Sequence, residues 1–179
     1  GLVRGFAVPT VCVLGNHDYW TDGHGVTSEL LHEQYTVLRN QHTRLHIRGA
    51  PLTIIGVDDA VTRQCDVSRS FRGIHQGDSR IILSHVPSLI DPIAELGGGL
   101  TLAGHTHGGQ VCVPYYGALI TNCDLDTTRA KGLSTHSAGG HTARLHVSAG
   151  MGSSPFATYR FACPPEVTVL TLTATDSNG

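Results

Sequence analysis

Short apolar runs recur along the chain, and most of them end at a glycine or a polar turn. Residues 7–14 (AVPTVCVL) form a nearly continuous apolar run rich in valine, which is typical of a strand buried on both faces. Further strands are predicted at residues 52–57, 80–83, 100–103, 143–148 and 167–173. The last of these alternates between apolar and polar positions and suits a half-exposed strand.

Two other segments carry helical signals. Apolar residues recur at helical spacing through residues 27–38, and a shorter helix is predicted at residues 91–96, before three consecutive glycines. Residues 121–141 are polar and rich in glycine, which predicts a loop region. Because no repeat or linker divides the chain, we expect residues 1–179 to form a single α/β domain.

Three of the predicted strands end in a turn that carries histidine. The turns are Gly-Asn-His-Asp at residues 15–18, Ser-His-Val-Pro at residues 84–87 and Gly-His-Thr-His at residues 104–107. Sites in α/β sheets form just beyond strand ends, so a sheet can bring these distant turns together. Twelve histidines in 179 residues make metal or proton chemistry a reasonable expectation.

The Gly-His-Thr-His turn is the strongest of the three signals. His105 and His107 are separated by one residue and framed by glycines, which let the backbone approach a ligand closely. A pair of solvated loop histidines is the alternative interpretation. The position directly after an apolar strand favours metal binding.

The other two turns gain weight from this one. Asn16 offers a neutral carbonyl ligand, His17 could act as an acid or as a phosphate donor, and Asp18 could orient that imidazole. Taken alone, this turn would be interpreted as an ordinary Asn- and Asp-rich turn. His85 alone would be interpreted as a packed or capping residue.

Composition narrows the function classes. A formal net charge of −2 and no basic block argue against a nucleic-acid surface. Five cysteines without a Cys-x-x-Cys pair argue against a disulfide framework or a structural zinc site. The chain contains no stretch of eighteen apolar residues, so no transmembrane segment is predicted. A cytoplasmic or membrane-associated location is expected.

The order of the three turns resembles the later motifs of the calcineurin-like metallophosphoesterases. Residues 16–20 (NHDYW), 104–111 (GHTHGGQV) and 160–172 (RFACPPEVTVLTL) further resemble the bacterial branch of that family that comprises membrane-associated phosphodiesterases. The resemblance covers essentially the whole chain. It implies a layered αββα sandwich, with two sheets packed between helices.

The resemblance also implies roles for the motif residues. Asn16, His85 and His105 would be ligands of one metal, and His107 would be a ligand of the other. His17 would contact the phosphoryl oxygen or assist the leaving group, with Asp18 beside it. The cofactors would be two divalent ions of Mn, Fe, Zn or Ni.

The first two motifs of the family, Asp-x-His and Gly-Asp-x-x-Asp, precede the Gly-Asn-His-Asp turn, and residues 1–14 supply neither. We therefore expect the chain to be the C-terminal portion of a metallophosphoesterase domain that lacks its N-terminal strand-helix-strand. An upstream segment could also bring the protein to a membrane surface.

With that portion present, the expected reaction is hydrolysis of a phosphoester of lipid or nucleotide type by a hydroxide held between two cations. The alternative is a non-catalytic interaction domain built on a degenerate metallophosphoesterase fold. The residues upstream of the Gly-Asn-His-Asp turn would discriminate between the two.

Overall fold

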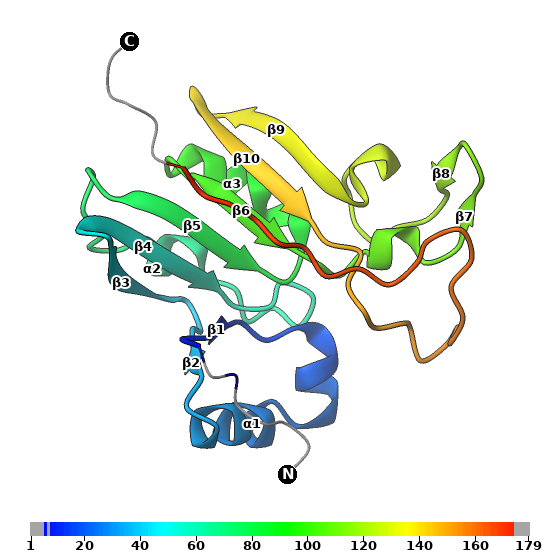
Figure 1. Ribbon diagram of the computed structural model, residues 1–179, viewed down its shortest axis with the longest axis horizontal. Coiled ribbons are helices and arrows are strands. Elements are labelled where there is room, and N and C mark those ends of the chain that lie inside the picture. The colour runs from blue at the N-terminus through cyan, green and yellow to red at the C-terminus, as the bar shows by residue number, and fades with distance from the viewer. Residues whose placement is uncertain (1–5, 7, 174–179) are drawn as a thin grey trace.

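The structure, a computed structural model, describes residue 6 and residues 8–173. Its main feature is a six-stranded mixed sheet with the strand order β3-β4-β5-β6-β10-β9 (Figure 1). The strands are β3 (Gln41–Ile47), β4 (Ala50–Val57), β5 (Ser79–Ser84), β6 (Leu100–Ala103), β10 (His141–Val147) and β9 (Gly132–Ala138). The four central strands are parallel, and both edge strands pair antiparallel with their neighbours. The predicted α/β class is confirmed, and the arrangement is consistent with a metallophosphoesterase sandwich.

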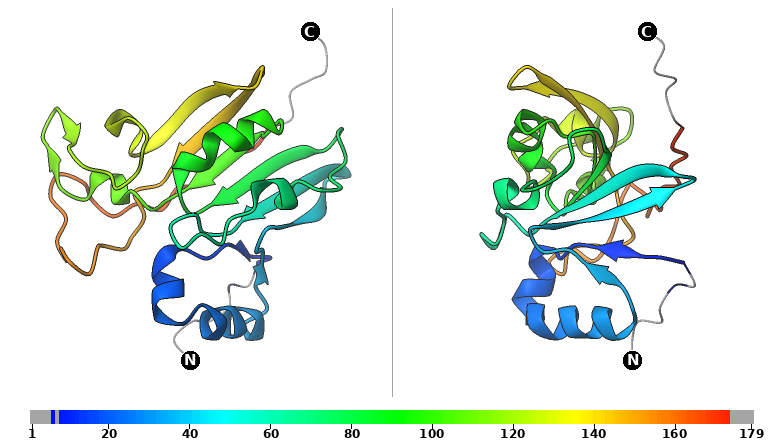
Figure 2. Two further views of the ribbon diagram at one scale, coloured as in Figure 1. Left: turned by 180° about the vertical axis from the view of Figure 1, so that it is seen from behind. Right: turned by 90° about the vertical axis from the view of Figure 1, so that its left-hand side faces the viewer.

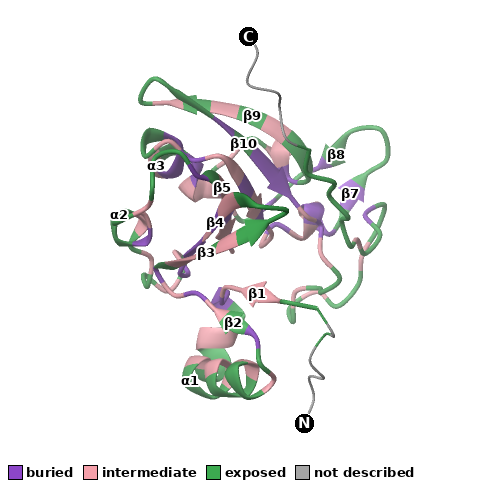
Figure 3. Cartoon of the chain, turned by 60° about the vertical axis from the view of Figure 1, so that its left-hand side comes forward, coloured by how far each residue is buried: buried purple, intermediate pink, exposed green. Residues whose placement is uncertain are grey.

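The core lies on one face of this sheet. Ile55, Ile82, Thr101 and Leu145 are in register across the four central strands, and all are buried. Two short helices, α2 (Val67–Ser70) and α3 (Ile90–Glu95), cover this face (Figure 2). Figure 3 shows the buried residues concentrated in the central strands, whereas the first helix is mostly exposed.

Most of the predicted strands are confirmed. Residues 52–57, 80–83, 100–103 and 143–148 correspond to β4, β5, β6 and β10, and the helix predicted at residues 91–96 is α3. The remaining short elements are the 3-10 turns η1 (Pro87–Leu89), η2 (His107–Gly109) and η3 (Thr127–Arg129), and the paired strands β7 (Cys112–Val113) and β8 (Gly117–Ala118).

The strand predicted at residues 7–14 is shorter and less buried than expected. β1 (Val11–Cys12) is half-buried and pairs in parallel with β2 (Thr36–Val37), whereas Val8 is exposed. Ala7 lies outside the described residues. Burial on both faces is wrong because β1 belongs to a two-stranded ladder and not to the main sheet.

The helix predicted at residues 27–38 begins and ends earlier. α1 spans Asn16–His32, with a kink at Asp22. It closes with two bonds, from Tyr35 N to Leu30 O and from Gln34 N to Leu31 O, around the left-handed Gln34 (φ 64°). This is a Schellman ending with glutamine where glycine is usual, so no stop signal is visible in the residues themselves. Tyr35 is buried beyond the helix rather than on its face.

Two predictions in the second half of the chain are wrong. The predicted loop at residues 121–141 contains β9, a mostly exposed edge strand whose polar sequence lacks the apolar alternation of a half-buried strand. Conversely, residues 167–173 form no strand, and Val167 and Val169 are exposed. They run over the face opposite α3, near Leu83 and Leu102 (Figure 1), without a hydrogen-bonded partner strand among the described residues.

Candidate metal centre

The parallel pairing of β5 and β6 places two of the histidine turns side by side. Ser84 is opposite Ala103 in the ladder, so His85 and His105 leave the same edge of the sheet. Gly104 N donates to His85 O over 3.1 Å, which extends this pairing into the turns. The two imidazole rings lie edge to face, with their centroids 5.0 Å apart.

Helix α1 brings the third turn to the same place. Asn16 is the first residue of this helix and is buried, although the rest of the helix is largely exposed. Its Oδ1 lies 2.8 Å from His85 Nε2, and His85 Nε2 lies 3.2 Å from His105 Nδ1. The three predicted ligands of one metal are therefore brought together.

Both imidazoles are held neutral. Burial lowers the pKa of His85 to about 4; nearby His105 adds to this effect, while Asp59 and Asp18 oppose it. Burial also lowers the pKa of His105, against a hydrogen bond with the Asn122 carbonyl that raises it. Neutral imidazole is the form that binds metal, so neither side chain carries a charge that opposes a cation at neutral pH. Asn16 Oδ1 can only accept, so a cation bound at His85 Nε2 would take the place of the proton that this nitrogen donates to Asn16.

The Asn122 carbonyl also selects the tautomer of His105. The carbonyl oxygen lies 3.1 Å from His105 Nε2 and can only accept, so this nitrogen carries the proton. Nδ1 then keeps its lone pair, and it faces His85 Nε2. Orientation of a ligating histidine through its other nitrogen is typical of metal sites.

The donor spacing fits one divalent cation. Two donors at about 2.1 Å from a metal and at right angles to each other are about 3 Å apart. The distances of 2.8 and 3.2 Å between the donor atoms of Asn16, His85 and His105 match this value. Among the described residues, no three His, Cys, Asp or Glu side chains cluster closely enough to hold a metal ion, so Asn16 is needed for the set.

The Gly-His-Thr-His turn has an unusual backbone conformation at both of its histidines. His105 and His107 both adopt left-handed φ values, 68° and 51°. Between them Thr106 is buried, and its hydroxyl donates to Ala130 O over 2.6 Å. Non-glycine residues in this region cost about 1–3 kcal/mol each and cluster at functional sites. Thr106 anchors the turn inside the protein, and both histidines line a cavity.

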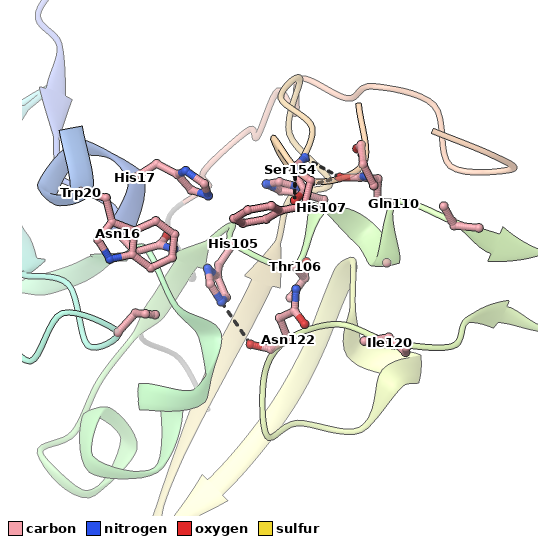
Figure 4. A pocket seen from close by; sticks show the side chains of 15 residues that line it. Asn16, His17, Trp20, His105, Thr106, His107, Gln110, Ile120, Asn122 and Ser154 are labelled. Atoms are coloured by element: carbon pink, nitrogen blue, oxygen red, sulfur yellow. Dashed lines mark hydrogen bonds between the residues drawn. The ribbon is translucent and has the colours of Figure 1, made fainter. Parts of the chain in front are cut away.

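This cavity has a volume of about 440 Å³ and lies beside the ligand set (Figure 4). Its polar lining includes His17, His107, Gln110 and Ser154. Its apolar lining includes Trp20, Val61, Ile120 and Phe156, all of which are exposed.

The structure places His17 and Asp18 differently from one another. His17 is exposed at the cavity, with its ring 4.8 Å from the Trp20 ring, centroid to centroid. The Asp18 carboxylate accepts from Gly15 N over 2.8 Å and so caps the start of α1. The Asp18 carboxylate therefore contacts the start of α1, and not the His17 imidazole that it was expected to orient.

Sequence reasoning missed several residues at the site. Asp59 follows β4, the strand next to β5, and its charge partly opposes the lowering of the pKa of His85 and of His105. It is fully buried, and its Oδ1 has no hydrogen-bond partner in the described part of the chain. The sequence feature that could have identified Asp59 is its position just after the end of a strand. Tyr115 and Tyr116 are exposed, because they lie in the turn between β7 and β8.

The five cysteines are all free; Cys112 and Cys163 are buried, whereas Cys12, Cys65 and Cys123 are half-buried. Within residue 6 and residues 8–173, no helix is both long and apolar enough to cross a membrane.

Known proteins resemble this chain along most of its length. An uncharacterized metallophosphoesterase of Bacillus subtilis, YkuE, is 30% identical over 172 residues, which are 93% of this chain and 57% of the relative. The phosphodiesterase YaeI of Escherichia coli is 29% identical over 167 residues, 92% of this chain and 58% of the relative. The UDP-2,3-diacylglucosamine pyrophosphatase LpxG of Chlamydia trachomatis is 29% identical over 150 residues, 81% of this chain and 44% of the relative.

The chain thus spans about half the length of these relatives. Neither a protein-family model nor a solved structure matches it. The names of these relatives agree with the metallophosphoesterase resemblance that the three histidine turns carry. The chain belongs to the calcineurin-like metallophosphoesterase family.

Proposed function

We propose that this protein is a metal-dependent phosphoester hydrolase, a phosphodiesterase or phosphatase that works with two divalent cations. The observation that carries the proposal is the convergence of Asn16 Oδ1, His85 Nε2 and His105 Nδ1 at distances of 2.8 and 3.2 Å. Two relatives support the reaction class, because one is named a phosphodiesterase and the other a pyrophosphatase.

Each residue has a task in this proposal. Asn16, His85 and His105 hold one cation, and His107 contributes to the other. Bound cations would supply Lewis-acid stabilisation of the phosphoryl oxygens and make a water molecule acidic enough to act as the nucleophile. His17 lies exposed at the cavity, where its imidazole can donate to a phosphoryl oxygen or to the departing oxygen.

The cavity supports a substrate that carries an apolar or aromatic group. Trp20, Ile120 and Phe156 line it beside the polar residues, and their side chains are 58%, 72% and 92% exposed. A phosphoester of lipid or nucleotide type would rest its acyl chains or its base on these side chains. Peripheral association with a membrane belongs to the same proposal for a lipid substrate.

The test is hydrolysis of an aryl phosphodiester by the Mn²⁺-loaded protein. His105→Ala should lower the rate by roughly 100-fold or more, because a ligand is lost. His141→Ala is the matched control, since His141 is exposed at the start of β10, at the opposite edge of the sheet. Equal rates for the protein and for His105→Ala would overturn the proposal. Absence of both hydrolysis and Mn²⁺ binding would favour the interaction domain.

A further inference from the structure

Gln110 has a fixed amide orientation. The side chain is buried, and its Nε2 donates to two backbone carbonyls, those of Ala157 and Tyr159 (3.2 Å to the latter). Its Oε1 accepts from Ser154 N over 2.7 Å. An amide nitrogen can only donate and an amide oxygen can only accept, so exchanging the two atoms would break all three bonds.

The backbone of Gln110 is anchored as well. Its N–H donates to His107 O, and its carbonyl accepts from Phe161 N, both over 3.0 Å. Its φ of 54° lies in the left-handed region, which a glutamine adopts only when its surroundings impose it. The side chain therefore has no easy alternative position.

This fixed oxygen determines the tautomer of His107. Gln110 Oε1 lies 2.9 Å from His107 Nδ1 (Figure 4). Because the oxygen can only accept, Nδ1 must carry a proton. In the neutral imidazole, Nε2 then keeps its lone pair, and His107 lines the cavity.

We propose that Gln110 is a positioning residue. It holds His107 as the Nδ1–H tautomer, which leaves Nε2 available to a cation, and it ties the cavity wall at residues 154–159 to that histidine. This inference rests on the proposed function, because it assigns His107 Nε2 to the metal centre. The Asn122 carbonyl selects the opposite tautomer of His105, in which Nε2 carries the proton and Nδ1 is available.

Two substitutions separate the two parts of this role. Gln110→Met has a similar length but neither donates nor accepts, so it removes the tautomer selection and the tie to the wall. Gln110→Glu keeps an acceptor for His107 Nδ1 but cannot donate to the carbonyls of Ala157 and Tyr159. Gln76→Met is the matched control, because Gln76 is exposed and precedes the start of β5, whereas His85 follows the end of this strand.

The first measurement is nitrogen NMR of the histidine side chains in the metal-free protein at pH 7.5. We expect His107 to show a protonated Nδ1 and an unprotonated Nε2 in the unaltered protein, in Gln76→Met and in Gln110→Glu. In Gln110→Met we expect a mixture of tautomers. A His107 protonated at Nε2 in the unaltered protein or in Gln110→Glu would overturn the inference, as would an unchanged tautomer in folded Gln110→Met.

The second measurement is Mn²⁺ binding to the same proteins. Gln110→Met should weaken binding about 10- to 100-fold, as is usual for partners that orient a metal-ligating histidine. Equal affinities for Gln110→Met and Gln76→Met would count against the positioning role. If the unaltered protein bound no Mn²⁺ but showed the expected tautomer, the proposed function would fail while the hydrogen-bond assignment stood.

Discussion

Replacing Gly15 with alanine tests the fit of the ligand set directly. Gly15 precedes α1 and has an extended backbone, with φ −114° and ψ 174°, which alanine adopts without strain. A Cβ at this position would lie only 2.6 Å from His85 Nδ1 and 2.6 Å from His85 Cε1. The perturbation is therefore a methyl group pressed onto the imidazole of a proposed metal ligand.

The magnitude follows from these distances. Ordinary carbon contacts lie at roughly 3.5–4.0 Å, so the imidazole must retreat by about 1 Å. Metal–ligand distances tolerate about 0.2 Å, so a shift of this size removes His85 from the set. Overpacking of a buried site costs about 1–3 kcal/mol, which corresponds to a drop in Tm of roughly 2–12 °C for a chain of this length.

The assay combines Mn²⁺ titration with thermal unfolding of the metal-free protein. Gly15→Ala should bind Mn²⁺ at least about 10-fold more weakly and unfold at a lower temperature. Gly104→Ala is the matched control, because Gly104 precedes His105 as Gly15 precedes Asn16. A Cβ at Gly104 meets no atom within 4 Å, so we expect little change in either quantity.

Two results would refute this reasoning. Unchanged Mn²⁺ affinity in Gly15→Ala would mean that the imidazole of His85 does not stand against Gly15 or does not bind the metal. Equal losses in Gly15→Ala and Gly104→Ala would mean that the glycines act through backbone freedom and not through the close approach to His85.

Three further predictions concern pH, helix anchoring and the second metal. The pKa of His85 is about 4 in the folded protein against 6.5 in the unfolded chain, so its contribution to stability, about 3 kcal/mol in total, is complete above about pH 6.5 and is lost as the pH falls to about 4. Urea unfolding from pH 7 to pH 4 should therefore show a smaller loss of stability in His85→Gln than in the unaltered protein. The Tyr19 hydroxyl donates to buried Asp58 over 2.5 Å, so Tyr19→Phe should lower the free energy of unfolding by about 1–2 kcal/mol and weaken Mn²⁺ binding slightly as α1 loosens. An unchanged urea midpoint would contradict this prediction. His107→Ala should reduce bound metal by one equivalent in elemental analysis while His141→Ala keeps the full amount, and an equal metal content in both would remove His107 from the centre.

The sequence predicted the elements whose signals are local. β5, β6 and α3 follow from short apolar runs and from the glycines at residues 97–99, and the resemblance supplied Asn16, His85 and His105 as one ligand set. The end of α1 was missed because it depends on a left-handed glutamine, Gln34, which carries no stop signal in the sequence.

Tertiary contacts decided the rest. The sequence by itself determined which residue types stand at the strand ends, because a strand signal and the turn after it are neighbours in the chain. It could not determine that Gly15 lies against the His85 ring, that the Asn122 carbonyl selects the tautomer of His105, or that Gln110 does so for His107. The contact of Gly15 with His85 spans 70 positions, and it exists only because α1 meets the edge formed by β5 and β6. The identity of the proposed ligands was therefore local information, whereas their tautomers and donor spacing depend on packing.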